Sequence, residues 1–450
     1  MQPKSALIAA ATLLLFLSAP PSARAQGDAE SASLERAAAL ISSERIGEAE
    51  QELNSILKAR PNDALAINLL GTVRAKQGRL DEAEALFSRS VRLDPQLIGA
   101  HMNLAYLYLL KGAPEKTTAE LREVLRLDPE NADASYRLAW VLLNQGRFDE
   151  CVAFVEQTRR AHAPSPALLV ILGDAQLKKG EAVKAEESYR QALDAQGDNA
   201  DALLGLAQVA QVKADAGSAA LYLRRAKDFV GNSPELLFKY AQVASNSNLN
   251  DDAVSALRRA VELKPDEPSY AFALGVVWLK KPDLQEAEQS FRRALRLRPD
   301  SARAQMYLGY TLLKQKKLPE ARALLEKSAQ GDATAPETFY YLGLIAQEQS
   351  EDERAVGLFT KAIQLSATFA HAHVALGATY LKLRDYARAQ QELEAGVKLN
   401  PEDSKAHYNL ALLYARLKDQ ARAQSEMQTV ERLKGAGKAQ EGDEAAPPNQ

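Results

Sequence analysis

The feature that most constrains this chain is a pattern that returns every 34 residues. Its clearest copy is 268–301, PSYAFALGVVWLKKPDLQEAEQSFRRALRLRPDS, whose first half carries apolar residues at helical spacing. In its second half Ala287, Phe291 and Ala294 stand at i, i+4 and i+7, and therefore share one face of a helix. Pro299 ends that helix, because an interior proline costs roughly 3 kcal/mol relative to alanine. The pattern predicts two short amphipathic helices joined by a tight turn.

The same frame runs from Glu30 to Gly437 without an insertion or deletion, which gives twelve repeats. Six repeats close with a proline at the same position: Pro61, Pro95, Pro129, Pro265, Pro299 and Pro401. A chain of 450 residues would ordinarily form two or three globular domains. The period predicts instead a stack of helix pairs that grows without needing one large core.

Small residues recur at fixed positions of the repeat. The eighth position is Gly or Ala in all twelve repeats, and the glycines are Gly71, Gly173, Gly275, Gly309, Gly343 and Gly377. Glycine inside a helix costs roughly 0.5–1 kcal/mol against alanine, so its repeated use predicts that another helix passes too close for a larger side chain. The twentieth position is alanine except at Thr117 and Cys151. Phe87, Phe291 and Phe359 fill a position of the second helix that is Leu or Val in most other repeats.

Together, the Leu-Gly of the first helix, the Ala, Phe and Ala of the second helix, the closing Pro and the 34-residue period resemble the tetratricopeptide repeat. The resemblance covers residues 30–437. It implies an all-α, right-handed α-solenoid, or superhelix, of about twelve helix-turn-helix units. In that family the first helices line a concave groove where ligands lie as extended segments or helices. Arg36, at a position that is leucine in ten repeats, fits a solvent-facing first helix.

Residues 1–25 have the pattern of a secretory signal peptide. Lys4 supplies the positive charge, residues 6–17 form an apolar stretch too short to span a bilayer, and Ala23 and Ala25 are the small residues of a cleavage site. The mature chain is therefore expected to be periplasmic or secreted, and the composition of the signal favours a bacterial periplasm. The alternative is a retained amphipathic anchor. No other stretch is apolar for 18 residues, so no membrane span is expected in the mature chain.

Three further segments depart from the repeat pattern. Residues 26–29 are predicted to be a short polar leader, and 438–450, with two prolines and no apolar period, to be a disordered tail. Residues 197–252 are the least regular part, with the polar run SNSNLNDD at 245–252. This stretch predicts either a looser joint between two halves or one loosely packed repeat.

Composition and motifs argue against several classes of function. A formal net charge of −3 gives no electrostatic case for nucleic acid or anionic lipid. No metalloprotease H-E-x-x-H, phosphate-binding loop or G-x-S-x-G elbow is present, and the repeats leave no region for a catalytic domain. Cys151 is the single cysteine, so no internal disulfide or thiolate cluster is expected, and it is predicted to be a small packed residue. We expect neither catalysis nor a cofactor.

The histidines do not form a metal site by their spacing. His101, His373 and His407 share the fourth repeat position, which predicts packing within the repeat. His371 and His373 are two residues apart, about 200° around a helix, and cannot share a ligand face. His162 is predicted to lie in a loop.

The resemblance assigns a set of first-helix positions to the groove. The candidate ligand-binding residues are Asn103, Tyr106, Tyr136, Arg137, Trp140, Gln208, Gln242, Phe272, Tyr307, Tyr310, Lys314 and Tyr341. Aromatic residues and arginine dominate binding hot spots. An exposed aromatic ridge beside amides would suit a peptide or protein segment, and it could also stack on sugar rings. The alternative is that these rings pack between neighbouring helices.

Five lysines share the thirteenth position: Lys76, Lys178, Lys280, Lys314 and Lys382. A cation in the last turn of a helix gains roughly 0.3–1 kcal/mol from the helix dipole, and the alternative is a basic track for an acidic ligand. The sequence thus predicts a non-catalytic scaffold of the bacterial cell envelope that binds a partner polypeptide. The alternative function is an exopolysaccharide-binding or export-accessory role. Self-association through a last helix that is still apolar at Met427, Val430 and Leu433 is a further hypothesis.

Overall fold

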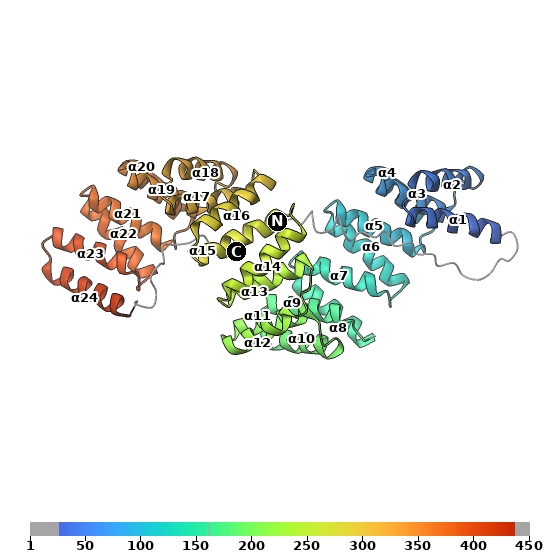
Figure 1. Cartoon of the computed structure of the whole chain (residues 1–450), viewed down its shortest axis with the longest axis horizontal. Coiled ribbons are helices and arrows are strands. Elements are labelled where there is room, and N and C mark those ends of the chain that lie inside the picture. The colour runs from blue at the N-terminus through green and yellow to red at the C-terminus, as the bar shows by residue number, and fades with distance from the viewer. Residues whose placement is uncertain (1–26, 162, 437–450) are drawn as a thin grey trace. The chain divides into compact units, whose positions relative to one another are not determined.

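The computed structural model describes residues 27–161 and 163–436, and all regular secondary structure in these ranges is α-helical (Figure 1). The chain divides into two units between Val230 and Gly231. The first unit contains α1 (Gly27–Ser42), α2 (Ile46–Ala59), α3 (Ala64–Lys76), α4 (Leu80–Leu93), α5 (Ile98–Leu110), α6 (Pro114–Leu127), α7 (Ala132–Asn144), α8 (Phe148–Ala161), α9 (Pro166–Lys178), α10 (Ala182–Ala195), α11 (Ala200–Val212) and α12 (Ala216–Lys227). The second contains α13 (Pro234–Asn246), α14 (Asn250–Leu263), α15 (Pro268–Lys280), α16 (Leu284–Leu297), α17 (Ala302–Lys314), α18 (Leu318–Gly331), α19 (Pro336–Glu348), α20 (Asp352–Leu365), α21 (Ala370–Lys382), α22 (Tyr386–Leu399), α23 (Ser404–Arg416) and α24 (Gln420–Ala436). The prediction of an all-α chain of twelve helix pairs is confirmed.

The ends and the boundary can be compared with the predicted segments. The predicted signal peptide, 1–25, and tail, 438–450, lie outside the described residues. Helix α1 begins at Gly27, so most of the predicted leader forms the first turn of a helix. The boundary at Val230 lies inside the stretch 197–252, where the four helices are nonetheless regular. Within the described ranges, no helix combines the length and apolar character needed to cross a membrane.

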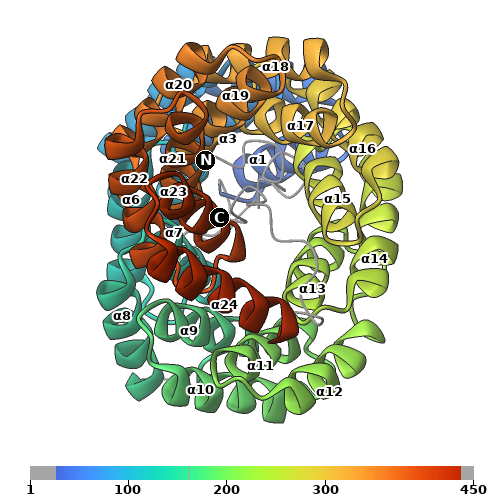
Figure 2. The same cartoon turned by 90° about the vertical axis from the view of Figure 1, so that its left-hand side faces the viewer.

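Within each unit the helix pairs form two layers. Each first helix packs against the second helix of its own repeat and, except for the first helix of each unit, against that of the repeat before it, as α9 does with α10 and α8. Most neighbouring first helices also touch each other, as α9 does with α7 and α11, whereas no two neighbouring second helices of the described chain approach in this way. First helices therefore form the inner, concave layer of each unit, and second helices the outer one. Figure 2 shows this arrangement for α13 and α15 inside α14 and α16.

Most first helices begin at polar residues that cap them, whereas α5, α19 and α21 follow Leu97, Ala335 and Phe369 and have no side-chain cap. Asp63 and Asn131 each accept a hydrogen bond at 2.9 Å from the backbone N–H three residues further on, and Ser301 accepts one at 3.3 Å. Such a cap is worth about 1 kcal/mol, because it satisfies an N–H that has no partner inside the helix. The caps fix where each repeat starts, two residues after the closing position that proline often fills.

The turn inside each repeat uses a left-handed residue at the fifteenth position. Its φ lies between 56° and 79° in eleven repeats and is 26° in the eighth, where proline resists this conformation. The twelve residues are Glu44, Gly78, Gly112, Gly146, Gly180, Ala214, Asn248, Pro282, Lys316, Ser350, Arg384 and Lys418. All are exposed, and only four are glycine, the residue that adopts this backbone without steric cost. The turn therefore holds its shape even where the sequence lacks the usual glycine signal.

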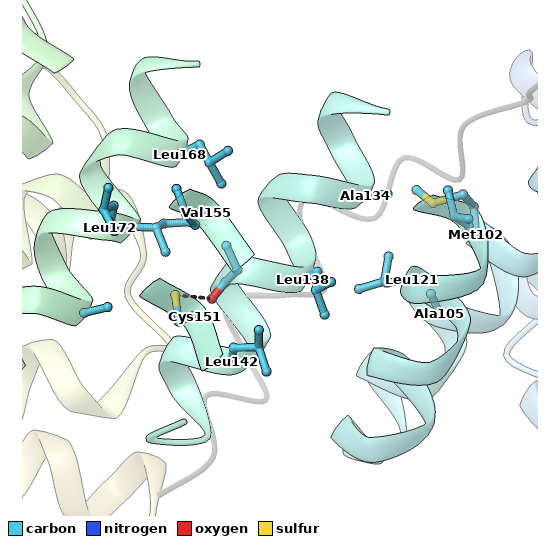
Figure 3. Packing of buried hydrophobic residues seen from close by; sticks show 14 of the residues in the cluster. Met102, Ala105, Leu121, Ala134, Leu138, Leu142, Cys151, Val155, Leu168 and Leu172 are labelled. Atoms are coloured by element: carbon cyan, nitrogen blue, oxygen red, sulfur yellow. Dashed lines mark hydrogen bonds between the residues drawn. The ribbon is translucent and has the colours of Figure 1, made fainter. Parts of the chain in front are cut away.

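The lone cysteine lies in the core of the first unit. Cys151 is fully buried and packs with Leu142, Val155 and Leu172 (Figure 3). Its thiol donates to the carbonyl oxygen of Ala139, with an Sγ–O distance of 3.4 Å. Burial raises the pKa of this thiol to about 12, with a smaller contribution from a nearby carboxylate. The prediction that Cys151 is a small packed residue is confirmed.

The eighth-position glycines lie where the two helices of a repeat cross. A Cβ atom added to Gly71, Gly173 or Gly275 would lie 2.6 Å from a ring carbon of the second helix, so no larger residue fits unless the ring moves. The predicted close approach is confirmed, and the neighbour is the second helix of the same repeat. The two positions are coupled, because every aromatic ring at the twenty-fourth position faces a glycine: Gly71 with Phe87, Gly173 with Tyr189, Gly275 with Phe291 and Gly343 with Phe359. Alanine at the eighth position accompanies only Leu, Val or Met.

This coupling predicts that Gly71→Ala destabilises the protein by about 1–3 kcal/mol, because the new methyl group overlaps the Phe87 ring. In a Phe87→Leu background the same change is expected to cost less, because leucine is smaller than the ring and alanine is the better helix former. Alanine with leucine already occurs at Ala105 and Leu121. Urea denaturation of the four variants, followed by circular dichroism, measures the coupling. Additive effects of the two changes would contradict this account of the crossing.

Candidate binding surface on the first helices

Four of the predicted groove tyrosines are not on the surface. The exposed fraction of the whole residue is 5% for Tyr106, 1% for Tyr307, 7% for Tyr310 and 0% for Tyr341. The prediction of an exposed aromatic ridge is wrong for these four, and the alternative of packing between helices is correct. Burial raises the pKa of Tyr307 and of Tyr341 above the ordinary value, because the charged phenolate would lose its hydration.

For Tyr307, Tyr310 and Tyr341 the reason is that each ring stacks on a ring from the neighbouring repeat. In the second unit the ring centroids of Phe272 and Tyr307 are 5.1 Å apart, and those of Tyr310 and Tyr341 are 4.9 Å apart. Each such pair joins two successive first helices and contributes roughly 0.5–1.5 kcal/mol beyond the apolar area that it buries. Phe272 itself is half-buried, and the Arg303 guanidinium lies 5.2 Å from its centroid. These rings stabilise the stack and leave little ring surface for a ligand.

Asn103 is also buried, with 5% of its surface exposed. Its side-chain amide donates to Asn68 Oδ1 at 3.0 Å and lies 3.5 Å from Thr72 Oγ1. The donors of Asn103 therefore face two buried polar residues of α3, one repeat earlier. Asn103 is therefore not an accessible side chain, and its predicted contact with a ligand stays a prediction.

Helix α7 presents the accessible aromatic cluster of the first unit. Tyr136 is 37% exposed, and Arg137 and Trp140 are half-buried. Trp140 lies four residues after Tyr136 and three after Arg137, so it is a neighbour of both on the helix surface, and the three side chains span about 100° of it. One turn later the exposed Asn144 donates to the Trp140 carbonyl oxygen at 2.8 Å. We call Tyr136, Arg137 and Trp140 the α7 surface.

A buried network holds the α7 surface in place. The Arg137 guanidinium lies 4.2 Å from the Tyr106 ring centroid and donates to the Asp133 carboxylate at 2.9 Å. The Tyr106 hydroxyl donates to the same carboxylate at 2.6 Å. Burial and this hydrogen bond raise the pKa of Tyr106 well above its ordinary value. Sequence reasoning missed Asp133, although its i, i+4 spacing from Arg137 is a signal for an ion pair.

The remaining predicted residues are accessible but scattered. Gln208 of α11 is half-buried, while Gln242 of α13 and Lys314 of α17 are exposed. Two lysines of the thirteenth position are held by bonds to other helices. Lys280 donates to the Ser245 carbonyl at 3.2 Å, and Lys382 pairs with Asp352 at 2.8 Å.

Burial lowers the pKa of Lys280. Its partner carbonyl lies in the last turn of the preceding first helix, which fits a role at a helix carboxyl end better than a basic track. Among the described residues, no group of three or more His, Cys, Asp or Glu side chains could hold a metal ion.

Two family models, both described as tetratricopeptide repeat, match the sequence. One matches residues 34–98, 172–234, 239–302, 283–336 and 374–432, and the other matches 109–169. The first model alone spans more than half of the chain. The chain belongs to the tetratricopeptide repeat family. This family consists in general of non-catalytic scaffolds for protein interactions, and the tetratricopeptide chain described here has their helix-pair architecture throughout its described part.

Solved structures with similar folds include three of different origin. The structure from the study of Pseudomonas aeruginosa pilF is 22% identical, with 44% of this chain and 91% of that chain covered and a TM-score of 0.41. Cut9 in complex with Hcn1 is 14% identical over 90% and 94% of the two chains, with a TM-score of 0.47. Yeast Tom70 is 15% identical over 92% and 97%, with a TM-score of 0.42. All three TM-scores are below 0.5, so we transfer no partner from these proteins. A search of curated proteins found no match.

The burial of the groove tyrosines predicts different outcomes for two superficially similar substitutions. Tyr341→Ala is expected to destabilise the tetratricopeptide chain by about 3–5 kcal/mol, because it empties a fully buried site. Tyr136→Ala is expected to cost about 1 kcal/mol or less, because its ring is partly in solvent. Thermal and urea unfolding followed by circular dichroism compare the two. Equal losses would show that exposure does not separate the packed tyrosines from the α7 surface.

Proposed function

We propose that this protein is a non-catalytic scaffold of the bacterial cell envelope whose first unit binds a segment of a partner polypeptide along its inner layer, at the α7 surface. The observation that carries the proposal is the placement of Tyr136, Arg137 and Trp140 on one accessible face of an inner-layer helix. Tyrosine, tryptophan and arginine are the residue types most enriched in binding hot spots. The packed tyrosines of the second unit do not offer this combination.

The supporting network makes the α7 surface suitable for tight contact. Arg137 is already fixed by Asp133 and by the Tyr106 ring, so little side-chain freedom is lost when a partner binds. Its charge is balanced by Asp133, which leaves rings and polar edges rather than an uncompensated cation. Such a surface favours a segment with apolar side chains and free backbone hydrogen-bonding groups. The predicted signal peptide at 1–25 supports the envelope location.

Site-specific photocrosslinking in cells tests the binding site. We expect Tyr136→p-benzoylphenylalanine to give a discrete crosslinked protein product that Trp140→Ala abolishes. The matched control is the same replacement at Phe229, which is 43% exposed and lies outside the first helices, in the turn after α12. A product whose added mass glycosidases remove would indicate the polysaccharide alternative. Identical products at both positions, or none at Tyr136, would contradict the proposed site.

Fusion of residues 1–50 to alkaline phosphatase without its own signal tests the location. We expect an active enzyme, because phosphatase folds with its disulfides only after export, and a mature chain that begins at Gln26 by mass spectrometry. Leu14→Arg, which places a charge in the apolar stretch 6–17, is the control and should abolish activity. An inactive fusion, or an active one that keeps Met1, would rule out cleavage and export by this signal.

A further inference from the structure

Three repeats share a polar contact that the proposed function does not use. In each, a histidine at the fourth position of the first helix contacts a glutamate 19 residues later on the second helix. The Nδ1–Oε2 distances are 2.7 Å for His101 and Glu120, 2.6 Å for His373 and Glu392, and 2.6 Å for His407 and Glu426. We call these contacts the His–Glu pairs. They belong to repeats three, eleven and twelve.

The second ring nitrogen has an equally constant partner. Nε2 lies 3.1 Å from the Pro95 carbonyl oxygen for His101, 3.2 Å from that of Ala367 for His373, and 2.9 Å from that of Pro401 for His407. Each carbonyl belongs to the segment that closes the preceding repeat, six residues before the histidine. One imidazole therefore joins both helices of its own repeat to the end of the repeat before it.

Counting donors shows that this geometry requires an additional proton. A carbonyl oxygen and an ionised carboxylate only accept hydrogen bonds, and a neutral imidazole carries a single N–H. Both contacts form if both ring nitrogens donate, which makes the ring an imidazolium. If the proton resides on the glutamate instead, the pair still holds one proton more than a neutral histidine beside an ionised glutamate.

The surroundings of the rings agree with this count. The side chains are 6%, 12% and 10% exposed for His101, His373 and His407. The charges that act on His101 come from Glu120 and Glu123, both on α6, one of the helices packed against α5. The carboxylates that face the other two rings are on α22 and α24. Burial alone would lower the pKa of His101, but the hydrogen bonds to Glu120 and Pro95 and the two negative charges raise it overall.

The chain also contains a version of this contact that cannot titrate. In repeat nine the fourth position is Gln305, whose side-chain amide donates to the Pro299 carbonyl oxygen at 2.7 Å. The position of the glutamate is Leu324 in that repeat. Gln305 thus keeps the bond to the preceding repeat at every pH, and it serves as an internal reference.

We propose that the His–Glu pairs are a pH-sensitive device that ties a repeat to its predecessor while protonated and releases it as the pH rises. A proton held more tightly in the folded state contributes stability that is complete below the unfolded pKa, about 6.5 for histidine, and is lost as the pH rises through the folded pKa. Once the proton has left, the single remaining N–H cannot serve both acceptors, so one of the two hydrogen bonds is lost. Two of the three pairs lie in the last two repeats, so the change is concentrated at α21 to α24.

Hydrogen exchange of the full chain between pH 5.5 and 8.5, corrected for intrinsic exchange rates, tests the proposal. We expect protection of α21 to α24 to fall with rising pH, by at most about tenfold per pH unit for each pair, and that of α17 and α18 to stay constant. His407→Gln/Glu426→Leu copies repeat nine and should remove the pH dependence of α23 and α24 while the helical circular dichroism is retained. Retention of the wild-type pH profile in this variant would overturn the proposal.

A second measurement does not depend on any variant. Nuclear magnetic resonance of the ring protons of the wild-type chain is expected to show His101 titrating above a pH of about 6.5, the ordinary pKa of histidine. Titration of His101 at or below that pH would overturn the proposal, whatever the exchange data show.

Discussion

The crossing of the two helices within each repeat is the contact on which the rest of the structure depends. At the eighth position the second helix passes so close that only glycine or alanine fits, and the ring of Phe87 or Tyr189 then fills the space above a glycine. Glycine in a helix costs roughly 0.5–1 kcal/mol. Burial of an aromatic side chain stabilises the fold by about 1.5–3 kcal/mol, which exceeds the cost of the glycine. Because the crossing recurs every 34 residues, every repeat presents the same faces to its neighbours, and the inner and outer layers follow.

The fold could be predicted from the sequence, because the period, the small residues and the closing prolines all describe contacts inside one repeat or with the next. The exposure of the groove residues could not be predicted from the sequence. Tyr136, Tyr340 and Tyr408 share the fifth position, yet Tyr136 and Tyr408 are 37% and 43% exposed and Tyr340 only 6%. Tyr340 is covered because Phe369, from the segment that closes its repeat, stacks on it at 5.1 Å. Burial of a fifth-position tyrosine therefore depends on which residue of the neighbouring segment packs on it, and no single position of the repeat pattern predicts this.

Other features were present in the sequence but become visible only when two positions are considered together. Aromatic rings at the twenty-fourth position always accompany glycine at the eighth, and histidine at the fourth position always accompanies glutamate at the twenty-third. Each position taken alone indicates only packing, which is how the histidines were interpreted. The pairing reveals a steric rule in one case and a repeated hydrogen-bonded contact between the two helices in the other. Because this chain contains twelve copies of one repeat, a comparison of the copies shows which pairs of residues the fold accepts at two positions.

The left-handed turn inside each repeat provides labelling positions at regular intervals along the chain. Its fifteenth-position residues are exposed and recur once per helix pair, and eight of the twelve already carry a side chain. The only native thiol, Cys151, is buried and resists ionisation. Cysteines introduced at two such turns, for example Lys316 and Arg384, would be the reactive ones, so fluorophores or spin labels could be placed at chosen repeats. The distance between two labels would report stretching or bending of the stack as a function of the number of repeats between them.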